Sequence, residues 1–401
     1  MLALVSALLA LASSPLHRVV VTGGTHGNEY TGVYLLDRLA MPEQQAALKR
    51  AYPSLAVETV LANPVAHKEN RRFMDTDLNR MFSSEALSDE SILGYEARRA
   101  KELALGCLRD AALNIDLHTT TSNMGCTLIV NTWSALTIRA AAYVAERWAA
   151  EPAPPAGVPL APLYVMLHDG GTQESSPHVC SAARDGLEIE CGPTPQGLVR
   201  ADVVATTERA LRLLLEYFEL CVSGRPPEPP ETLEVFFDLG KVSFLEFEGG
   251  VRESSALPSG LVAPSLQDGD FQPLQTGEPM FVTLGGETVP YDGRYGDMVY
   301  PVFVNEVGHG LGTRCKPILR ACADSCVCFT FLYAGGILLS SEWARHRVDT
   351  QNALAGPQTM MNEEWLLPKR RMPMARKLRL VASFSFRVTV RYASGNHNAD
   401  P

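Results

Sequence analysis

Long hydrophobic runs, excess positive charge and a regular cysteine framework are all missing from this chain. No apolar run reaches the roughly 18 residues of a membrane-spanning helix, so no membrane span is predicted. The formal net charge is −10 and the isoelectric point is near 5.5, which argues against a nucleic-acid partner. The nine cysteines are odd in number and scattered. This pattern favours reduced thiols and a cytoplasmic protein.

The first 17 residues leave a second location open. The segment "MLALVSALLALASS" is apolar and resembles the core of a signal peptide, but it lacks a basic stretch before that core. We interpret residues 1–17 as an N-terminal extension. The alternative is a segment that targets the chain or directs its secretion.

Residues 18–222 alternate between strand-like and helix-like patterns. Short buried runs such as "RVVVT", "LNIDLHT" and "GLEIECG" are typical of strands, and "ADVVATTERALRLLLEYFELCV" has the spacing of a long amphipathic helix. The pattern predicts an α/β domain, with a mixed sheet flanked by helices on both faces.

Composition divides the rest of the chain into three parts. Residues 223–231 form a proline-rich linker, and residues 232–306 contain short strand-like runs that predict a smaller C-terminal β-rich domain. Residues 307–401 carry 13 basic and six acidic residues, unlike the acidic remainder. We interpret this last part as a divergent basic tail, whose composition is also compatible with disorder.

The loop "GGTHGNE" at residues 23–29 follows the first predicted strand. It has neither the glycine spacing of a dinucleotide site nor the Gly-Lys-Ser/Thr of a phosphate loop. Instead, His26 and Glu29 are metal-ligand residues at a turn between a strand and a helix. A catalytic zinc ion needs three protein ligands. His118, in "NIDLHT", supplies a third at the end of another predicted strand, with Asp116 two residues before it.

Six motifs in order resemble the aspartoacylase family: "VVVTGGTHGNEYTGVYLL", "LANP", "DTDLNRMF", "IDLHTTTSNMG", "IECGPTPQGLVRAD" and "VYPVFVNE". They span residues 18–306. The resemblance implies the carboxypeptidase-like zinc hydrolase fold, with one Zn²⁺ per chain held by His26, Glu29 and His118. It also implies zinc-dependent hydrolysis of small N-acyl L-amino acids to a carboxylate and a free amino acid.

The same resemblance implies roles for residues around the metal. Arg72 matches the arginine that polarises the scissile carbonyl, a position where a guanidinium stabilises developing negative charge. Asn79 and Arg80 match the pair that holds the substrate α-carboxylate, which suits the fork of an arginine. Asp77 is expected to orient the arginines, or else to cap a helix.

Glu190 matches the general base of the family. A buried carboxylate there would take a proton from water and deliver it to the leaving amine. Glu188 alternates with Glu190 on the same strand face and competes for the role.

Two departures from the family pattern bear on the substrate and the tail. Relatives that prefer N-acetylaspartate have an arginine where this chain has Cys180, with Arg184 nearby but out of register. The change favours N-acetylated aromatic amino acids or mercapturic acids. After residue 306, His309 stands in the register of an active-site tyrosine of the family. The four cysteines of the tail fit zinc-finger spacing poorly.

Alternative functions stay open from the sequence. They are aspartoacylase activity proper, removal of succinyl groups from amino acids, and zinc binding without turnover because the C-terminus is altered. The oligomeric state is also open, and a homo-oligomer is one of the options.

Overall fold

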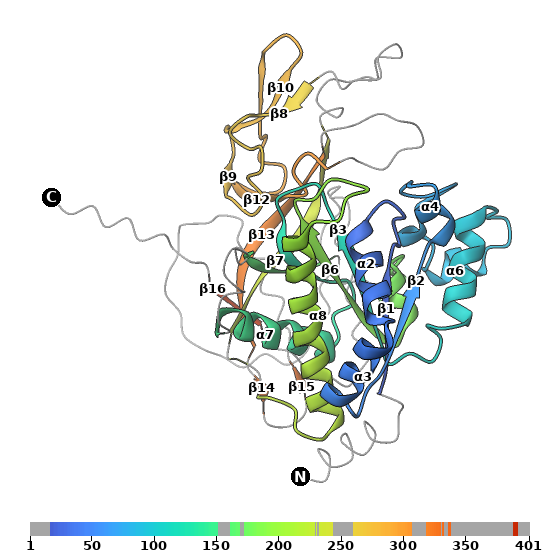
Figure 1. Ribbon diagram of the computed structural model, residues 1–401. Coiled ribbons are helices and arrows are strands. Elements are labelled where there is room, and N and C mark those ends of the chain that lie inside the picture. The colour runs from blue at the N-terminus through green and yellow to red at the C-terminus, as the bar shows by residue number, and fades with distance from the viewer. Residues whose placement is uncertain are drawn as a thin grey trace, which may run out of the picture.

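The computed structural model describes residues 17–150, 161–168, 172–228, 230, 232–243 and 260–306, with the backbone of four further strand segments. In order, the strands of the main domain are β1 (Arg18–Gly23), β2 (Ala56–Leu61), β3 (Leu113–Thr119), β4 (Gly125–Val130), β5 (Leu163–Leu167), β6 (Asp185–Gly192) and β7 (Thr232–Ser243). Its helices are α2 (Tyr30–Leu39), α3 (Pro42–Ala51), α4 (Pro64–Lys68), α5 (Ser84–Ser88), α6 (Tyr95–Leu105), α7 (Ala135–Ala150) and α8 (Ala201–Val222), with short 3₁₀ helices η1 (Leu78–Arg80) and η2 (Val179–Ala182) (Figure 1).

The remaining strands belong to the C-terminal part of the chain. They are β8 (Gly260–Val262), β9 (Leu274–Gln275), β10 (Pro279–Thr283), β11 (Thr288–Pro290), β12 (Met298–Val302), β13 (Ile318–Phe329), β14 (Phe331–Leu332), β15 (Gly336–Ile337) and β16 (Val388–Arg391). Strands β8, β10 and β11 form a separate antiparallel sheet. The apolar N-terminal segment, His309 and Cys315 lie outside the described residues.

The main sheet is mixed and runs in the order β2-β1-β3-β6-β4-β5-β7, continuing through β13, β12 and β9. Strands β2, β1, β3 and β6 are parallel, and β4 is antiparallel to β6. The carboxyl ends of β1, β3 and β6 therefore meet at one edge of the sheet, where polar side chains that follow them can converge. The mixed sheet predicted from the sequence is confirmed.

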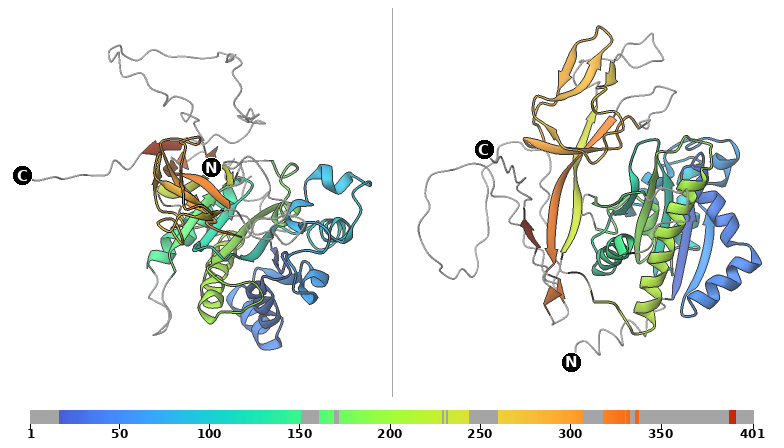
Figure 2. Two further views of the ribbon diagram at one scale, coloured as in Figure 1. Left: turned by 90° about the horizontal axis from the view of Figure 1, so that it is seen from above. Right: turned by 60° about the vertical axis from the view of Figure 1, so that its left-hand side comes forward.

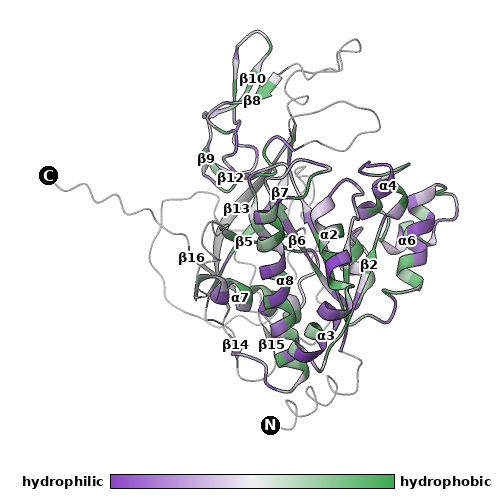
Figure 3. Cartoon of the chain, in the orientation of Figure 1, coloured by the Kyte–Doolittle hydropathy of each residue, from purple (hydrophilic) through white to green (hydrophobic). Residues whose placement is uncertain are grey.

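Helices cover both faces of this sheet. The core on one face joins β1, β3, β4, β5 and β6 to α2, α7 and α8, and Figure 2 shows α8 running alongside the sheet. A smaller core on the other face contains residues of α6, η1 and η2. Hydrophobic and hydrophilic residues alternate along α8 in Figure 3, as expected for a helix with one buried face.

Strand β7 belongs to the main sheet, although the sequence placed it at the start of the β-rich domain. It pairs in parallel with β5, with Met166 opposite Phe236 and Leu167 opposite Phe237. Alternation of apolar residues predicts a strand but does not determine which sheet it joins. The predicted domain boundary at residue 232 stays a prediction.

The first helix packs unusually close to the sheet. A Cβ atom on Gly32 of α2 would lie 2.9 Å from the backbone oxygen of Leu117, and one on Gly23 of β1 would lie 2.9 Å from the carbonyl carbon of Gly32. Both positions therefore require glycine. This close approach fixes α2 against β1 and β3, directly after Glu29, the N-cap residue of the helix.

We expect Gly32→Ala to displace α2, because its new methyl group meets rigid backbone. The free energy of unfolding should fall by about 1–3 kcal/mol, as in other overpacked sites, and chemical denaturation would measure it. Gly285→Ala is the control, because its Cβ would meet only the Thr283 hydroxyl at 3.7 Å. Equal stability of the two variants would contradict the tight contact.

Candidate active site

Three metal-ligand side chains converge at the carboxyl ends of β1 and β3. His26 Nδ1 lies 2.6 Å from Glu29 Oε1, and His118 Nδ1 lies 3.1 Å from Glu29 Oε2. One ligand atom from each of the three residues lies within 4.8 Å of the others, and all three residues are buried. The structure therefore brings together the three residues that the sequence proposed as metal ligands.

Two aspartates orient the imidazole rings. His26 Nε2 lies 3.0 Å from Asp77 Oδ1, and His118 Nε2 lies 2.7 Å from Asp116 Oδ2. Two threonine hydroxyls in turn donate to Asp116. An Nε2–H that donates to its aspartate leaves Nδ1, on the side of Glu29, as the ring nitrogen that could bind a metal ion. Two neutral imidazole nitrogens and one carboxylate fit a divalent metal such as zinc.

The Glu29 carboxylate is a buried charge at the centre of this cluster. Its side chain is 4% exposed, and it accepts a hydrogen bond from the Thr119 backbone N–H at 2.9 Å. Burial raises the pKa of Glu29, but the neighbouring imidazoles of His26 and His118 outweigh burial and hold that pKa well below its usual range. The Arg72 guanidinium lies 3.3 Å from Oε1. The carboxylate is therefore ionised and surrounded by donors.

The loop that carries Asp77, Asn79 and Arg80 contacts the metal-ligand cluster and also lines a pocket beside it. Asp77 caps η1 by accepting from the Asn79 backbone N–H at 2.9 Å, and its carboxylate also lies 3.6 Å from Arg72 Nη2. The guanidinium of Arg80 donates to the Asn79 carbonyl at 2.7 Å. Asn79 and Arg80 both line the pocket beside the cluster.

A buried glutamate holds that loop in place. Glu96 of α6 is fully buried and accepts backbone hydrogen bonds from Met74 at 2.6 Å, Asp75 at 2.9 Å and Thr76 at 3.3 Å. The Asn63 side chain donates to the same carboxylate at 3.2 Å. A charged acceptor shared by three successive loop amides restrains the segment that leads to Asp77.

The two glutamates of β6 have different surroundings. Glu188 Oε1 lies 3.0 Å from His178 Nδ1 and accepts from Asn79 Nδ2 at 3.3 Å. Burial raises the pKa of Glu188, but His178 and its other partners hold it well below the usual range. Glu190 Oε1 is buried without a hydrogen-bond partner among the described residues. Burial, and then the charge of Glu29, raise the pKa of Glu190 well above its usual range.

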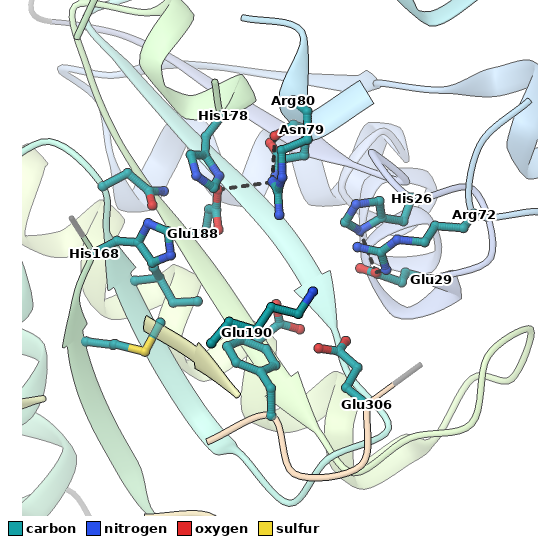
Figure 4. A pocket seen from close by; sticks show the side chains of 15 residues that line it. His26, Glu29, Arg72, Asn79, Arg80, His168, His178, Glu188, Glu190 and Glu306 are labelled. Atoms are coloured by element: carbon teal, nitrogen blue, oxygen red, sulfur yellow. Dashed lines mark hydrogen bonds and ion pairs between the residues drawn. The ribbon is translucent and has the colours of Figure 1, made fainter. Parts of the chain in front are cut away.

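One pocket contains most of these side chains and several that the sequence did not identify. Figure 4 shows His26, Glu29 and Arg72 at one end of the pocket and His168, His178 and Glu188 at the other. The lining residues not predicted from the sequence are Ile129, Asn131, Met166, His168, His178, Lys241, Phe303 and Glu306. Some come from β5 and the segment after it, and β5 was not recognised as a strand in the sequence.

Arg184 is not among the residues that line the pocket. It precedes β6, at the end of the strand opposite to Glu190, and lies 3.9 Å from the carboxylate of Asp185. Six residues of extended strand separate Arg184 and Glu190 by roughly 20 Å, further than an arginine side chain reaches. Cys180 is 1% exposed and lies behind the pocket, in contact with Glu188 at 3.8 Å.

No helix among the described residues is long and apolar enough to cross a membrane. Residues 15–218 match the succinylglutamate desuccinylase/aspartoacylase catalytic domain, and residues 250–308 match the AstE/AspA barrel-sandwich hybrid domain.

Known proteins resemble the chain over most of its length. A human N-acyl-aromatic-L-amino acid amidohydrolase (carboxylate-forming) is 37% identical over 312 residues, covering 75% of this chain and 89% of the relative. Aspartoacylase from Rattus norvegicus is 34% identical over 307 residues, covering 75% and 91%. The crystal structure of murine aminoacylase 3 superposes with a TM-score of 0.62 at 31% identity, covering 78% of this chain and 97% of that one. The chain belongs to the succinylglutamate desuccinylase/aspartoacylase family.

Proposed function

We propose that this chain hydrolyses N-acyl L-amino acids, preferably those with aromatic or S-substituted cysteine side chains, and uses one zinc ion. The observation that carries the proposal is the convergence of His26, Glu29 and His118 beside a pocket that also contains Glu190. The names of relatives support hydrolysis of an acyl amino acid. The five described cysteines are free, which supports a cytoplasmic location.

The metal ligands and Glu190 would divide the chemistry of amide hydrolysis. Zinc, held by His26, Glu29 and His118, would supply Lewis-acid activation. Glu190 takes one proton from the attacking water molecule while the water oxygen bonds to the acyl carbon. It then delivers the proton to the amine nitrogen as the carbon–nitrogen bond breaks. The unpartnered Glu190 Oε1 supports this assignment, because Glu188 is already engaged by His178 and Asn79.

Three further residues bind and polarise the substrate in this proposal. Arg72 lies beside Glu29 and stabilises negative charge that develops on the acyl oxygen. Asn79 and Arg80, on the pocket wall, hold the α-carboxylate of the substrate. A free α-carboxylate is therefore required, which restricts turnover to acyl amino acids rather than internal peptide bonds.

The ligand assignment predicts that His118→Ala loses the metal, because one of three protein ligands disappears. Elemental analysis of the purified variant should show zinc occupancy far below one per chain. His17→Ala, which changes an exposed histidine, is the control and should keep full occupancy. Full zinc occupancy in His118→Ala would overturn the ligand set.

The general-base assignment predicts that Glu190→Gln keeps the metal and loses about 10²–10⁴-fold in kcat. The amide is close in size to the carboxylate but cannot take the proton. Steady-state kinetics with parallel zinc analysis would measure both effects. Glu188→Gln is the matched comparison on the same strand. A larger fall in kcat for Glu188→Gln than for Glu190→Gln would show that the two roles are reversed.

Because this chain has Cys180 where aspartate-selective relatives have an arginine, we predict that N-acetyltyrosine is a better substrate than N-acetylaspartate. A side-chain carboxylate without its arginine loses charge-assisted hydrogen bonds of about 1.5–3 kcal/mol each, roughly 10- to 150-fold in kcat/KM. Side-by-side kcat/KM values test this, and Arg184→Ala should leave both unchanged. A tenfold preference for N-acetylaspartate would refute the prediction.

A further inference from the structure

An unsatisfied hydrogen-bond acceptor lies in the pocket wall formed by β4. Asn131 directly follows β4, is 3% exposed and lines the pocket. Its Oδ1 atom has no hydrogen-bond partner among the described residues. Burying an amide oxygen without a donor is costly, so the position calls for a donor from outside the protein.

The thiol of Cys180 fixes which atom of this amide is left unsatisfied. Asn131 Nδ2 donates to Cys180 Sγ at 3.3 Å, and Cys180 Sγ contacts Glu188 Oε1 at 3.8 Å. An ionised carboxylate only accepts hydrogen bonds, so the thiol hydrogen points to Glu188. The sulfur then faces Asn131 as an acceptor, which turns the NH₂ group to the sulfur and Oδ1 away from it.

The neighbouring part of the pocket wall adds apolar surface and the carboxylate of Glu188. Ile129 of β4 lies opposite Glu188 of β6, and Met166 of β5 lies beside Ile129. All three line the pocket. The contacts of Glu188 with Asn79, Cys180 and His178 all involve Oε1. This part of the wall therefore offers oxygen acceptors on an apolar background, which favours a donor group.

We infer that Asn131 Oδ1 is a specificity-determining acceptor for the substrate side chain, and that Cys180 is the positioning residue that orients it. The inference rests on the proposed function and replaces its side-chain preference with a chemical criterion. The favoured substrates are N-acyl amino acids whose side chain ends in a hydrogen-bond donor, such as a phenol or a primary amide. Cys180 stands where aspartate-selective relatives have an arginine. Those relatives favour a side-chain carboxylate, whereas Cys180 gives this pocket a preference for a hydrogen-bond donor.

Two pairs of substrates of nearly equal size test the inference: N-acetyltyrosine with N-acetylphenylalanine, and N-acetylasparagine with N-acetylleucine. The pairs differ in length, so the donor is presented at two depths. In at least one pair, the wild-type enzyme should favour the donor-bearing substrate about tenfold or more in kcat/KM, because the apolar analogue leaves Oδ1 unpaired.

Two variants test the role of the thiol. Cys180→Ala lets the Asn131 side-chain amide rotate, so the preference for the donor-bearing substrate should fall at least threefold. Cys180→Ser keeps a hydroxyl that donates to Glu188 and accepts from Asn131, so this variant should retain the preference. Glu58→Gln, at an exposed ion pair on β2, is the surface control.

The outcomes separate the two proposals. Absence of turnover with every N-acyl amino acid would refute the proposed function itself. Turnover without a donor preference in either pair would overturn the acceptor subsite alone, and this wild-type result depends on no variant folding. An unchanged preference in a folded Cys180→Ala variant would overturn the positioning role of the thiol.

Discussion

The buried negative charge of Glu29 is the constraint on which this structure depends. A carboxylate that is 4% exposed needs cations and donors around it, and it lies against two imidazoles, a backbone N–H and the Arg72 guanidinium. The partners come from three segments: the loop after β1 carries His26, β3 carries His118 and Thr119, and the loop before η1 carries Arg72. The glycine contact between α2 and the sheet sets the position of Glu29, and β3 sets that of His118. Assembly of the fold therefore also brings the three candidate metal ligands together.

The alternation of side chains along β6 gives the pocket two carboxylates of different character. Glu188 is engaged by His178 and Asn79 and stays ionised, so it acts as part of the wall. Glu190 lies nearer the carboxyl end of the strand and has an oxygen without a partner. The two residues have the same chemical type, but their surroundings differ. For that reason we propose the role of general base for Glu190 and not for Glu188.

The sequence predicted the cluster well because local patterns determine it. The strand Leu113–Thr119 and the helix Ala201–Val222 agree with the predicted segments, and His26, Glu29 and His118 all follow or end strands. The pocket wall was harder to predict. Asn131 and His168 acquire their positions from the neighbouring strands β4 and β5, and strand order is not visible in sequence spacing.

Closeness in sequence also did not place Arg184 near the pocket. It is close to Glu190 in sequence, but an extended strand holds the two residues at opposite ends.

Zinc-edge X-ray absorption spectroscopy of the purified full-length protein tests the central claim most directly. It reports the atoms bound to the metal without reference to activity. The proposed site predicts one zinc ion with two imidazole nitrogens and only oxygen as further ligands, at about 2.0–2.2 Å. A sulfur ligand at about 2.3 Å, or a spectrum without two imidazoles, would contradict the site at His26, Glu29 and His118.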